Sequence, residues 1–535
     1  MSPVAPRAVV GGLPAYRPGR SAAQAVADHG LASAVKLASN ELPYGPLPSV
    51  ADAIQAATPD VNRYPDHRAN ALRQALAERS GVDAGRVTVG CGSVGLLFQL
   101  ASAFCESGDE VVYGWRSFEA YPIVTRLAGA TPVAVPVRRQ ALDLAAMAGA
   151  TTERTRLVLV ANPDNPHGTV ASDEEVRALV EAVPETCLVV FDEAYREFVS
   201  RSDARSAVDV VGERANVVVL RTFSKAHGLA GLRVGYGIGA PEVVAAVDKL
   251  LWPFAVNHLG QRAALASLEA ADALAARVEG VIRERGRVAA ALRHLGFSVP
   301  DPQANFVWLA AGAAGAAGRL AAALEALGVV TRPFDGDGVR VTIGAPAEND
   351  RFLDSFEIAA ARVGAAEGWQ LPTGGSARRV AGWLDRLDAV ESRLTGLSTR
   401  RRAGRTAPDP GGTERWDEGQ VWAHIGELGA YWLGELRSVV DAGNDGATSF
   451  GRVKSDPGRV AAIETGRRSR PADHLAHARR AMDGLRALLA GLDDAEWGRR
   501  GVHPTLGAMT VDAMLEEFVI GHLEQHAAQL EGLAP

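Results

Sequence analysis

The sequence contains few cysteines, no long apolar run and no excess of positive charge. Its three cysteines, Cys91, Cys105 and Cys187, are too few and too scattered for a disulfide framework or a zinc site built from thiolates. No apolar run approaches the roughly 20 residues that span a bilayer, and the N-terminal residues lack the pattern of a signal peptide. These absences predict a protein that is neither exported nor anchored and that works in the reducing cytoplasm.

The charge balance excludes a further class of partners. The 56 Lys and Arg residues stand against 63 Asp and Glu residues, and the net charge of -7 offers no general attraction for nucleic acid or an anionic membrane. Hydrophobic residues make up 47% and charged residues 22%, which excludes a mainly disordered, collagen-like or coiled-coil chain. With 535 residues, the chain should form about three or four folding units.

Alternating strand and helix patterns predict an α/β domain in the first part of the chain. Short β-branched runs begin near residues 87, 111, 157, 188 and 217, and segments of helical period separate them. This alternation predicts βαβ units and a largely parallel sheet with helices on both faces. From about 265 to 360, helical stretches surround strand-like runs near 306, 329 and 339, which predicts a smaller α+β domain.

A stretch rich in glycine separates this region from a helical one. Residues 364–378 have the composition of a linker. Four helices with apolar periodicity and no strand-like run between them follow, near 378–398, 416–441, 472–492 and 510–531. Their natural packing is a four-helix bundle. We therefore expect an α/β part over residues 1–363, a linker over 364–378 and an all-α bundle over 379–535.

One lysine lies directly after a predicted buried strand, in a position suited to covalent chemistry. Partial desolvation there would lower the pKa of the Lys225 amine and allow it to form a Schiff base. Thr222, Ser224 and Arg233 supply two hydroxyls and a guanidinium, the groups that hold a phosphate beside such an imine. A Ser-Lys pair by itself is more often part of a surface turn, so the interpretation depends on other segments.

Three further segments follow predicted strands and should therefore meet at the same edge of the sheet. Gly92 and Ser93 precede a helix, whose first backbone N–H groups would face a phosphate. Asp192 would pair with a protonated ring nitrogen, and Asn165 and Tyr195 could form hydrogen bonds with a ring oxygen. Each group matches one part of pyridoxal phosphate.

This ordered set resembles the fold-type I pyridoxal-phosphate aminotransferases, in particular the histidinol-phosphate aminotransferase family. The resemblance covers about residues 10–355 and includes the segments 37–45, 62–66 and 339–344. It implies a homodimer in which each chain has a large domain of about residues 45–260 and a small domain from the N-terminal segment plus about 261–363. With Lys225, Asp192 and Tyr195 as the catalytic residues, the expected cofactor-binding set is Gly92, Ser93, Val94, Tyr121, Asn165, Asp192, Tyr195, Thr222, Ser224, Lys225, Arg233 and Tyr64.

The resemblance also implies roles for individual residues. Tyr64 would reach the cofactor phosphate of the other subunit, Tyr121 would stack on the pyridine ring, and Arg340 would hold the substrate carboxylate. His167 stands where the family usually has a threonine, and we interpret it as a tuning change. We interpret His227 as structural, because Lys225 already performs the proton transfer.

The amino donor follows from a narrower resemblance. Segments 90–94, 115–122 and 253–257 resemble the actinobacterial branch of aromatic amino acid aminotransferases. We therefore predict transfer of the amino group of an aromatic amino acid to 2-oxoglutarate. Asn40 and Tyr16 would contact the substrate, and Tyr16 and Phe254 would form walls for its side chain unless they are ordinary core residues. Histidinol phosphate is the alternative donor, and decarboxylation of a phosphorylated amino acid is the alternative reaction.

Histidines are enriched in the last third of the chain. His522 and His526 are four residues apart on the predicted buried stripe of the last helix, and His424 faces the same core from the second helix. A three-histidine metal site is therefore possible, and hydrogen-bonded core histidines are the alternative. We predict that His503 lies in a loop at the mouth of the bundle and that His474 and His477 face solvent.

Residues 378–531 resemble the DinB-like family of metal-binding four-helix bundles, which includes mycothiol-dependent transferases and maleylpyruvate isomerases. The resemblance implies one divalent metal ion, Zn²⁺ or Ni²⁺, at His424, His522 and His526, with an open coordination position that could activate a thiol. Because no cysteine follows Cys187, a low-molecular-weight thiol would have to come from outside the chain. A non-catalytic interaction module is the alternative.

Overall fold

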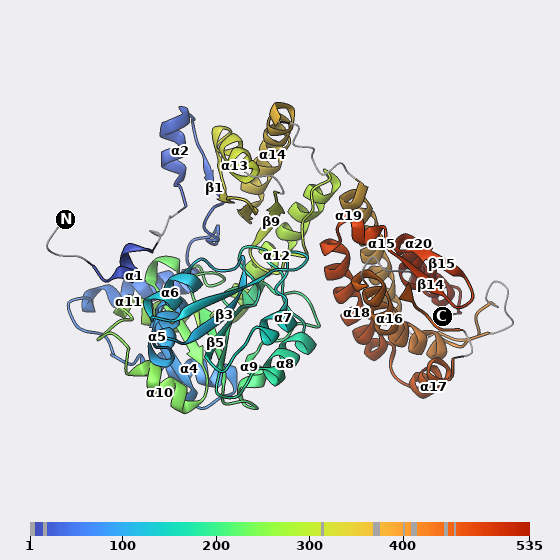
Figure 1. The fold of residues 1–535 in the computed structure, drawn as a ribbon, viewed down its shortest axis with the longest axis horizontal. Coiled ribbons are helices and arrows are strands. Elements are labelled where there is room, and N and C mark those ends of the chain that lie inside the picture. Colours follow the sequence, from blue (N-terminus) through green and yellow to red (C-terminus); the bar gives the residue numbers. More distant parts are fainter. Residues whose placement is uncertain are drawn as a thin grey trace. The chain divides into compact units, whose positions relative to one another are not determined.

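The computed structural model describes residues 6–13, 19–311, 315–367, 375–399, 402–407, 415–442, 448–453 and 456–534. The chain divides into two compact units (Figure 1). The larger covers residues 1–200, 204–292 and 299–371, and the smaller covers residues 372–535 together with 201–203 and 293–298. None of the helices in the described ranges is long and apolar enough to cross a membrane.

A seven-stranded sheet forms the centre of the larger unit (Figure 1). All its strands run parallel except β8, which is antiparallel to both of its neighbours. The prediction of a largely parallel sheet is confirmed, although β4 and β8 were not foreseen. The valine-rich strand β6 is buried at every position, as expected for a strand covered on both faces. The strand order is β2 (Val87–Cys91), β8 (Val234–Ile238), β7 (Val217–Thr222), β6 (Leu188–Asp192), β5 (Thr155–Ala161), β3 (Glu110–Trp115) and β4 (Thr131–Pro136).

Helices connect these strands, as the alternating pattern predicted. The ends of several helices are readable from the sequence. For example, α8 begins with a capping box in which Ser172 and Glu175 satisfy each other's backbone N–H groups. The helices before and around this sheet are α1 (Ala8–Gly11), α2 (Ala22–His29), α3 (Pro48–Ala57), α4 (Asn70–Ser80), α5 (Gly92–Phe104), α6 (Ala120–Leu127), α7 (Leu144–Gly149), α8 (Asp173–Ala182), α9 (Val208–Val211), α10 (Pro241–Asp248) and α11 (His258–Glu269).

The predicted small α+β part is also confirmed. Strands β11 (Arg332–Phe334), β12 (Gly338–Thr342) and β9 (Phe306–Ala310) form an antiparallel sheet. The N-terminal segment joins this part through β1 (Val35–Lys36), which pairs in parallel with β10 (Val329–Val330). The accompanying helices are α12 (Ala271–His294), α13 (Ala316–Ala326) and α14 (Pro346–Glu367).

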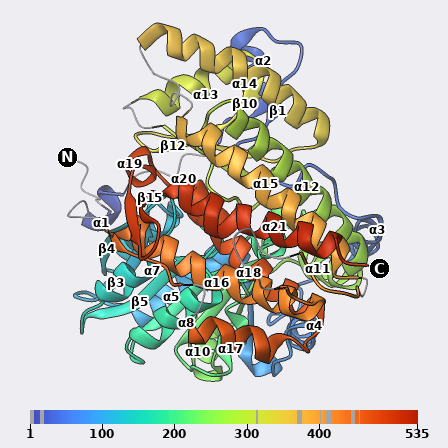
Figure 2. The same cartoon turned by 90° about the vertical axis from the view of Figure 1, so that its right-hand side faces the viewer.

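Four long helical segments build the smaller unit, close to the predicted ranges. They are α15 (Gly375–Leu397), α16 (Glu418–Asp441), α18 (Pro471–Gly491) and a last segment that ends with α21 (Ile520–Glu531). Figure 2 shows α15 beside α21, and α16 packs along α18. Leucine, valine and tryptophan side chains from all four segments form one continuous buried core.

The prediction of an all-α unit is wrong in one respect. Strands β13 (Thr448–Ser449), β14 (Arg500–His503) and β15 (Gly507–Thr510) form a small sheet, and the short helices α17 (Pro457–Gly466) and α19 (Asp494–Trp497) lie between the long ones. Strands of two to four residues are too short to produce a recognisable alternation in the sequence.

The last predicted helix is also interrupted. It consists of α20 (Val511–Met514), a π-helical turn over Leu515–Val519 and α21. A Cβ atom on Gly521 would lie 2.1 Å from the carbonyl oxygen of Glu516, so this wide turn requires glycine at position 521. The turn ends three residues before His522 and sets the rotation of α21.

The predicted linker is shorter than its composition indicated. Helix α14 continues to Glu367 and α15 begins at Gly375, so both ends of the 364–378 segment are helical. Residues 368–374 lie outside the described residues.

Candidate functional site

A cavity of about 280 Å³ lies in the larger unit, where the parallel strands end. Strands β2, β5, β6 and β7 each direct the residues after their carboxyl ends into it, and Arg233 enters it from the start of β8. This is the edge at which doubly wound sheets bind ligands. The predicted site residues among its lining are Asn40, Ser93, Val94, Asn165, Asp192, Tyr195, Thr222, Ser224, Lys225, Arg233 and Arg340.

Lys225, the residue predicted to act as the nucleophile, lines the cavity. Its Nζ donates a hydrogen bond to the carbonyl oxygen of Ser39 at 3.2 Å and lies 5.5 Å from the centre of the Tyr195 ring. Burial, reinforced by the positive charge of Arg340, lowers the pKa of the Lys225 amine to about 7. A large fraction of the amine is therefore neutral near pH 7 and can attack a carbonyl carbon.

Asp192 ends β6 with a carboxylate that is only partly satisfied. Tyr121, which is fully buried, donates its hydroxyl to Asp192 Oδ2 at 3.5 Å. Within the described part of the chain, Asp192 Oδ1 is buried without a hydrogen-bond partner. Burial raises the pKa of Asp192 to about 6. A cationic N–H group at Oδ1 would satisfy this oxygen and stabilise its charge, and the protonated ring nitrogen of pyridoxal phosphate is such a group.

The side chains predicted to hold a phosphate lie together beside the first turn of α5. Thr222 Oγ1 donates to Ser224 Oγ at 2.9 Å, and Arg233 Nη1 donates to the same oxygen at 3.2 Å. Gly92 begins α5 with a φ of 72°, and a Cβ atom there would lie 2.5 Å from Arg233 Nη2. Glycine is required here because the guanidinium packs directly on the start of the helix, where Ser93 follows. Hydroxyls, a guanidinium and helix N–H groups together suit a phosphate monoester.

Hydrogen bonds of Asn40 and Arg340 join the small α+β part to the cavity. Asn40 Nδ2 donates to the hydroxyl oxygen of Tyr195 at 2.9 Å, so the hydroxyl proton of Tyr195 can be donated elsewhere. Arg340 donates from Nη1 to Asn165 Oδ1 and from Nη2 to the carbonyl oxygen of Ala38, the latter at 2.9 Å. Arg340 is buried, so an incoming carboxylate would meet it in a poorly solvated environment.

Four predicted residues within the described ranges do not line the cavity of their own chain: Gly92, Tyr121, Tyr64 and Phe254. Tyr64 is 82% exposed and stacks on Phe254 with ring centres 4.3 Å apart. The expectation that Phe254 forms a wall of the cavity in its own chain is therefore wrong, because the ring packs on Tyr64 instead. Tyr16 lies outside the described residues.

The two histidines near the motifs are both buried and bonded. His167 Nδ1 lies 2.6 Å from Asp164 Oδ2, and Ser117 donates to the other oxygen of the same carboxylate at 2.5 Å. His227 Nδ1 lies 2.7 Å from Ser267 Oγ, and burial lowers the pKa of His227 to about 3. Neither histidine lines the cavity.

Sequence reasoning missed several residues of the cavity wall. Phe118 and Phe334 supply aromatic surface, and Arg332 donates to Glu119 at 2.9 Å. Phe118 and Glu119 lie inside the segment 115–122 on which the resemblance rests, so the sequence could have indicated that they line the cavity. Arg332 and Phe334 belong to a three-residue strand with no motif of its own.

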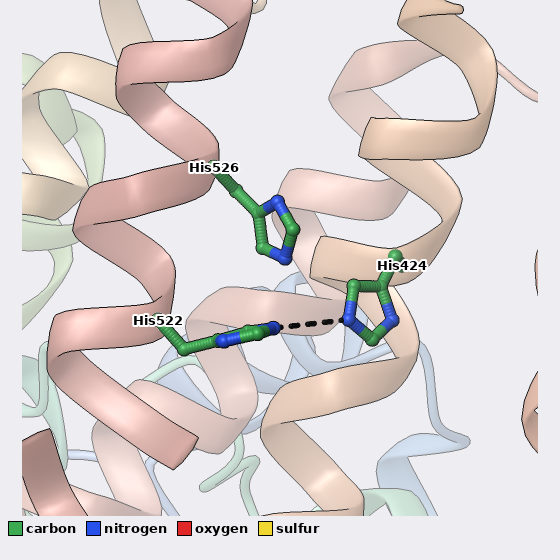
Figure 3. A group of neighbouring side chains, drawn as sticks. All are labelled: His424, His522 and His526. Carbon is green, nitrogen blue, oxygen red and sulfur yellow. Dashed lines mark hydrogen bonds between the residues drawn. The ribbon is translucent and has the colours of Figure 1, made fainter. Parts of the chain in front are cut away.

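The smaller unit brings three histidines together (Figure 3). One ring nitrogen from each of His424, His522 and His526 lies within 4.8 Å of the others, and the two Nε2 atoms of His424 and His522 are 3.3 Å apart. Burial lowers the pKa of His424 well below its usual value, so its imidazole is neutral and can bind a metal ion.

The other histidines of this unit differ from the prediction in two cases. His503 is the last residue of β14 rather than part of a loop, and it is buried beside Phe450 and Phe518. His474 does not simply face solvent, because it is half-buried and its Nε2 lies 2.9 Å from the carbonyl oxygen of Gly466. His477 is exposed, as predicted.

Comparisons with known proteins agree with this division. The profile of the family described as aminotransferase class I and II matches residues 32–356, and that of the DinB superfamily matches residues 385–530. The aromatic amino acid aminotransferase of Thermobifida fusca is 53% identical over 347 residues, which are 65% of this chain and 95% of that protein. The enzyme of the same name from Mycobacteroides abscessus is 51% identical over 341 residues, 64% of this chain and 95% of its own.

A solved structure shares both fold and sequence with the larger unit. The histidinol-phosphate aminotransferase from Sinorhizobium meliloti, determined in complex with pyridoxal-5'-phosphate, superposes with a TM-score of 0.62 at 30% identity. The match covers 68% of this chain and 99% of that one. The chain therefore belongs to the class I and II aminotransferases, which work with pyridoxal phosphate, and it carries a DinB-superfamily domain C-terminal to the aminotransferase part.

Proposed function

We propose that the aminotransferase part moves the amino group of an aromatic amino acid to a 2-oxo acid, with 2-oxoglutarate as the acceptor. The observation that carries this proposal is the identity of about half of all aligned positions with relatives named aromatic amino acid aminotransferase. Phe118 and Phe334 in the cavity wall support it, because they offer apolar surface to an aromatic ring. Histidinol phosphate is less favoured, since the relative with that name shares only 30% of its positions.

Different residues around the cavity would bind the cofactor and transfer the proton. Pyridoxal phosphate supplies an electron sink when it is bound. Asp192 Oδ1 would keep the ring nitrogen protonated, and Tyr121, which donates to Asp192 Oδ2, is the aromatic ring that we assign to the pyridine. Lys225 Nζ carries a proton to and from the substrate, which its lowered pKa permits near pH 7.

The remaining residues bind and orient. Gly92, Ser93 and Val94 at the start of α5 would hold the cofactor phosphate together with Thr222, Ser224 and Arg233. Asn165 and Tyr195 would bind the ring oxygen. Arg340 would hold the carboxylate that the amino acid and the 2-oxo acid share, and Asn40 orients the Tyr195 hydroxyl. The site residues thus keep the reacting carbon next to Lys225.

A screen of amino donors with 2-oxoglutarate tests the substrate. Phenylalanine and tyrosine should show higher kcat/KM values than aspartate, and histidinol phosphate should be no better than either. An apolar pocket discriminates by about 1–3 kcal/mol per lost group, so a preference of roughly 10- to 200-fold is expected. Phe118→Ala should lower kcat/KM for phenylalanine more than for aspartate, which serves as the internal control. A strong preference for histidinol phosphate would instead assign the enzyme to that substrate.

A homodimer is the second part of the proposal. Tyr64 and Trp252 are 82% and 77% exposed, and Val61, Leu250 and Phe254 are exposed nearby in sequence. So many large apolar side chains on one pair of segments favour a surface that a partner covers. In a homodimer, Tyr64 would complete the phosphate site of the second subunit.

A cytoplasmic location stays a prediction from the cysteine content.

For the DinB domain we propose one divalent metal ion, Zn²⁺ or Ni²⁺, at His424, His522 and His526. Two nitrogens that bind one ion tetrahedrally at about 2.0–2.1 Å are about 3.3 Å apart. The Nε2 atoms of His424 and His522 have this separation, 3.3 Å. Three ligands leave an open position, at which a thiol from outside the chain could be activated. A domain that only mediates interactions is the alternative.

Elemental analysis of the full chain tests the metal. The wild-type protein should hold about one equivalent, and His522→Ala/His526→Ala should hold almost none, because one remaining imidazole binds weakly. His477→Ala removes an exposed imidazole from the same domain and should leave the metal content unchanged. Equal and near-zero metal in all three proteins would exclude the site and favour the interaction module. Full occupancy without any thiol-dependent activity would keep the metal and exclude the transferase role.

A further inference from the structure

In a metal-binding histidine, one ring nitrogen binds the metal ion and the other carries a proton that needs a hydrogen-bond acceptor. Such histidines usually donate this N–H to a carboxylate or a carbonyl oxygen, which selects the tautomer and orients the ring. Figure 3 shows the three rings converging from two helices, His424 from α16 and the other two from α21. The surroundings of the outward-facing nitrogens therefore decide whether the cluster is ready to bind.

Glu427 faces the outer nitrogen of His424. The two residues are three positions apart on α16, and Glu427 Oε2 lies 3.4 Å from His424 Nδ1. Both atoms are buried and have no hydrogen-bond partner within the residues that the structure describes. Leaving a buried donor or acceptor unsatisfied costs about 1–3 kcal/mol. A shift of a few tenths of an ångström would join these two atoms and satisfy both.

The carboxylate of Glu427 is itself held in place. Its Oε1 atom accepts from Arg452 Nη2, and the guanidinium of Arg452 lies 3.8 Å from the centre of the Tyr431 ring. Tyr431 is on α16, seven residues after His424, and therefore on the same side of the helix. Arg452 thus neutralises a carboxylate that is mostly buried and keeps its second oxygen directed at His424.

His526 has a comparable partner on its own helix. Its Nδ1 atom lies 2.8 Å from Gln529 Oε1, three residues later on α21. An amide oxygen can only accept, so the bond places the proton on Nδ1. The lone pair of His526 is then on Nε2, the ring nitrogen that faces the other two histidines in Figure 3.

We propose that Glu427 and Gln529 are positioning residues of the metal site, which fix the Nδ1–H tautomers of His424 and His526 and direct both Nε2 atoms at one divalent cation. This inference rests on the proposed metal site. Glu427 also places a negative charge next to His424 without binding the cation itself. This charge raises the basicity of His424 and the affinity of the site for the cation.

Zinc affinity of the full chain, measured by competition with a chromogenic chelator, tests the proposal. Glu427→Ala and Gln529→Ala should each weaken zinc binding by about 10- to 100-fold. Glu427→Gln keeps an oxygen acceptor without the charge and should recover part of the loss. Glu391→Ala is the matched control, because Glu391 is a similarly shielded carboxylate held by Arg479 and Arg486 but contacts no histidine of the cluster. Its zinc affinity should equal that of the wild type.

A cobalt spectrum separates positioning from simple stabilisation. With Co²⁺ at the site, Glu427→Gln should shift the visible absorption bands, since His424 becomes a weaker donor, whereas Glu391→Ala should not. Wild-type affinity and spectrum in the folded Glu427→Gln and Gln529→Ala proteins would overturn the proposal while the metal site stands. If the wild-type chain itself binds no zinc, the metal site fails and the proposal falls with it. Circular dichroism shows whether each variant is folded. If Glu427→Ala is unfolded, the zinc affinity of Glu427→Gln decides the test in its place.

Discussion

Lys225→Ala should abolish transamination and the visible absorbance of the bound cofactor. An alanine at position 225 has no amine that could replace Lys225 Nζ, which lies 5.5 Å from the centre of the Tyr195 ring in a half-buried side chain. Proton transfer by a positioned side chain alone contributes about 10²- to 10⁴-fold, and the loss of the covalent attachment adds to this. Turnover of phenylalanine should therefore fall by at least about 10⁴-fold, which a coupled assay and a titration with pyridoxal phosphate would measure.

Lys249→Ala provides the control for this experiment, since Lys249 is exposed and does not line the cavity. It should keep wild-type turnover and absorbance. In the wild type, attachment of the cofactor should become faster as the pH rises through about 7, because the neutral amine increases above its lowered pKa. Retained turnover in Lys225→Ala would remove this lysine from the reaction.

Asp192→Ala should keep the bound cofactor but lose most of the catalytic rate. The carboxylate is buried, and its Oδ1 atom has no hydrogen-bond partner among the described residues. We assign the ring nitrogen of the cofactor to it. Without this carboxylate the ring nitrogen would lose its proton and the ring would be a poor electron sink. We expect the activation barrier to rise by about the 3–5 kcal/mol that the loss of a buried ion pair costs. At 1.36 kcal/mol for each factor of ten, kcat should fall by roughly 10²- to 10⁴-fold. Single-turnover kinetics with phenylalanine would measure this.

A loss of stability could imitate this effect, so a second carboxylate serves as the control. Asp248 is also shielded from solvent and pairs with Arg68 and Arg73, but it does not line the cavity. Asp248→Ala should lower the unfolding temperature and leave kcat of the folded enzyme intact. If Asp192→Ala turns over at the wild-type rate, the carboxylate does not act on the cofactor ring.

The candidate site was predictable because its residues follow strands. Parallel strands end at one edge of a sheet, so Ser93, Asn165, Asp192 and Lys225 had to approach one another once the strands were identified. Roles that depend on contacts between distant segments were harder to predict from the sequence. Nothing in the spacing of Arg340 and Asn165 indicated the hydrogen bond that joins them, because it depends on how the small α+β part packs on the sheet.

In the DinB domain, too, some features were predictable from the sequence and others were not. The four-residue spacing of His522 and His526 placed both on one helix face, and the spacing of His424 and Glu427 put a carboxylate one turn away on α16. The π-helical turn before His522 and the three short strands had no such signal. Elements of two to five residues produce too few repeats for a period to be recognised.

The sequence alone determined which candidate groups occur where: a lysine, an aspartate and residues suited to a phosphate at the ends of successive strands, and two histidines at helical spacing with a third on another helix. Local spacing was sufficient there because strand and helix geometry repeat regularly. Only the tertiary structure decided which partners complete each group. The pairing of Tyr121 with Asp192, of Phe254 with Tyr64 and of Arg452 with Glu427 joins segments far apart or on different elements. Such contacts depend on packing of the whole domain, which no local pattern encodes.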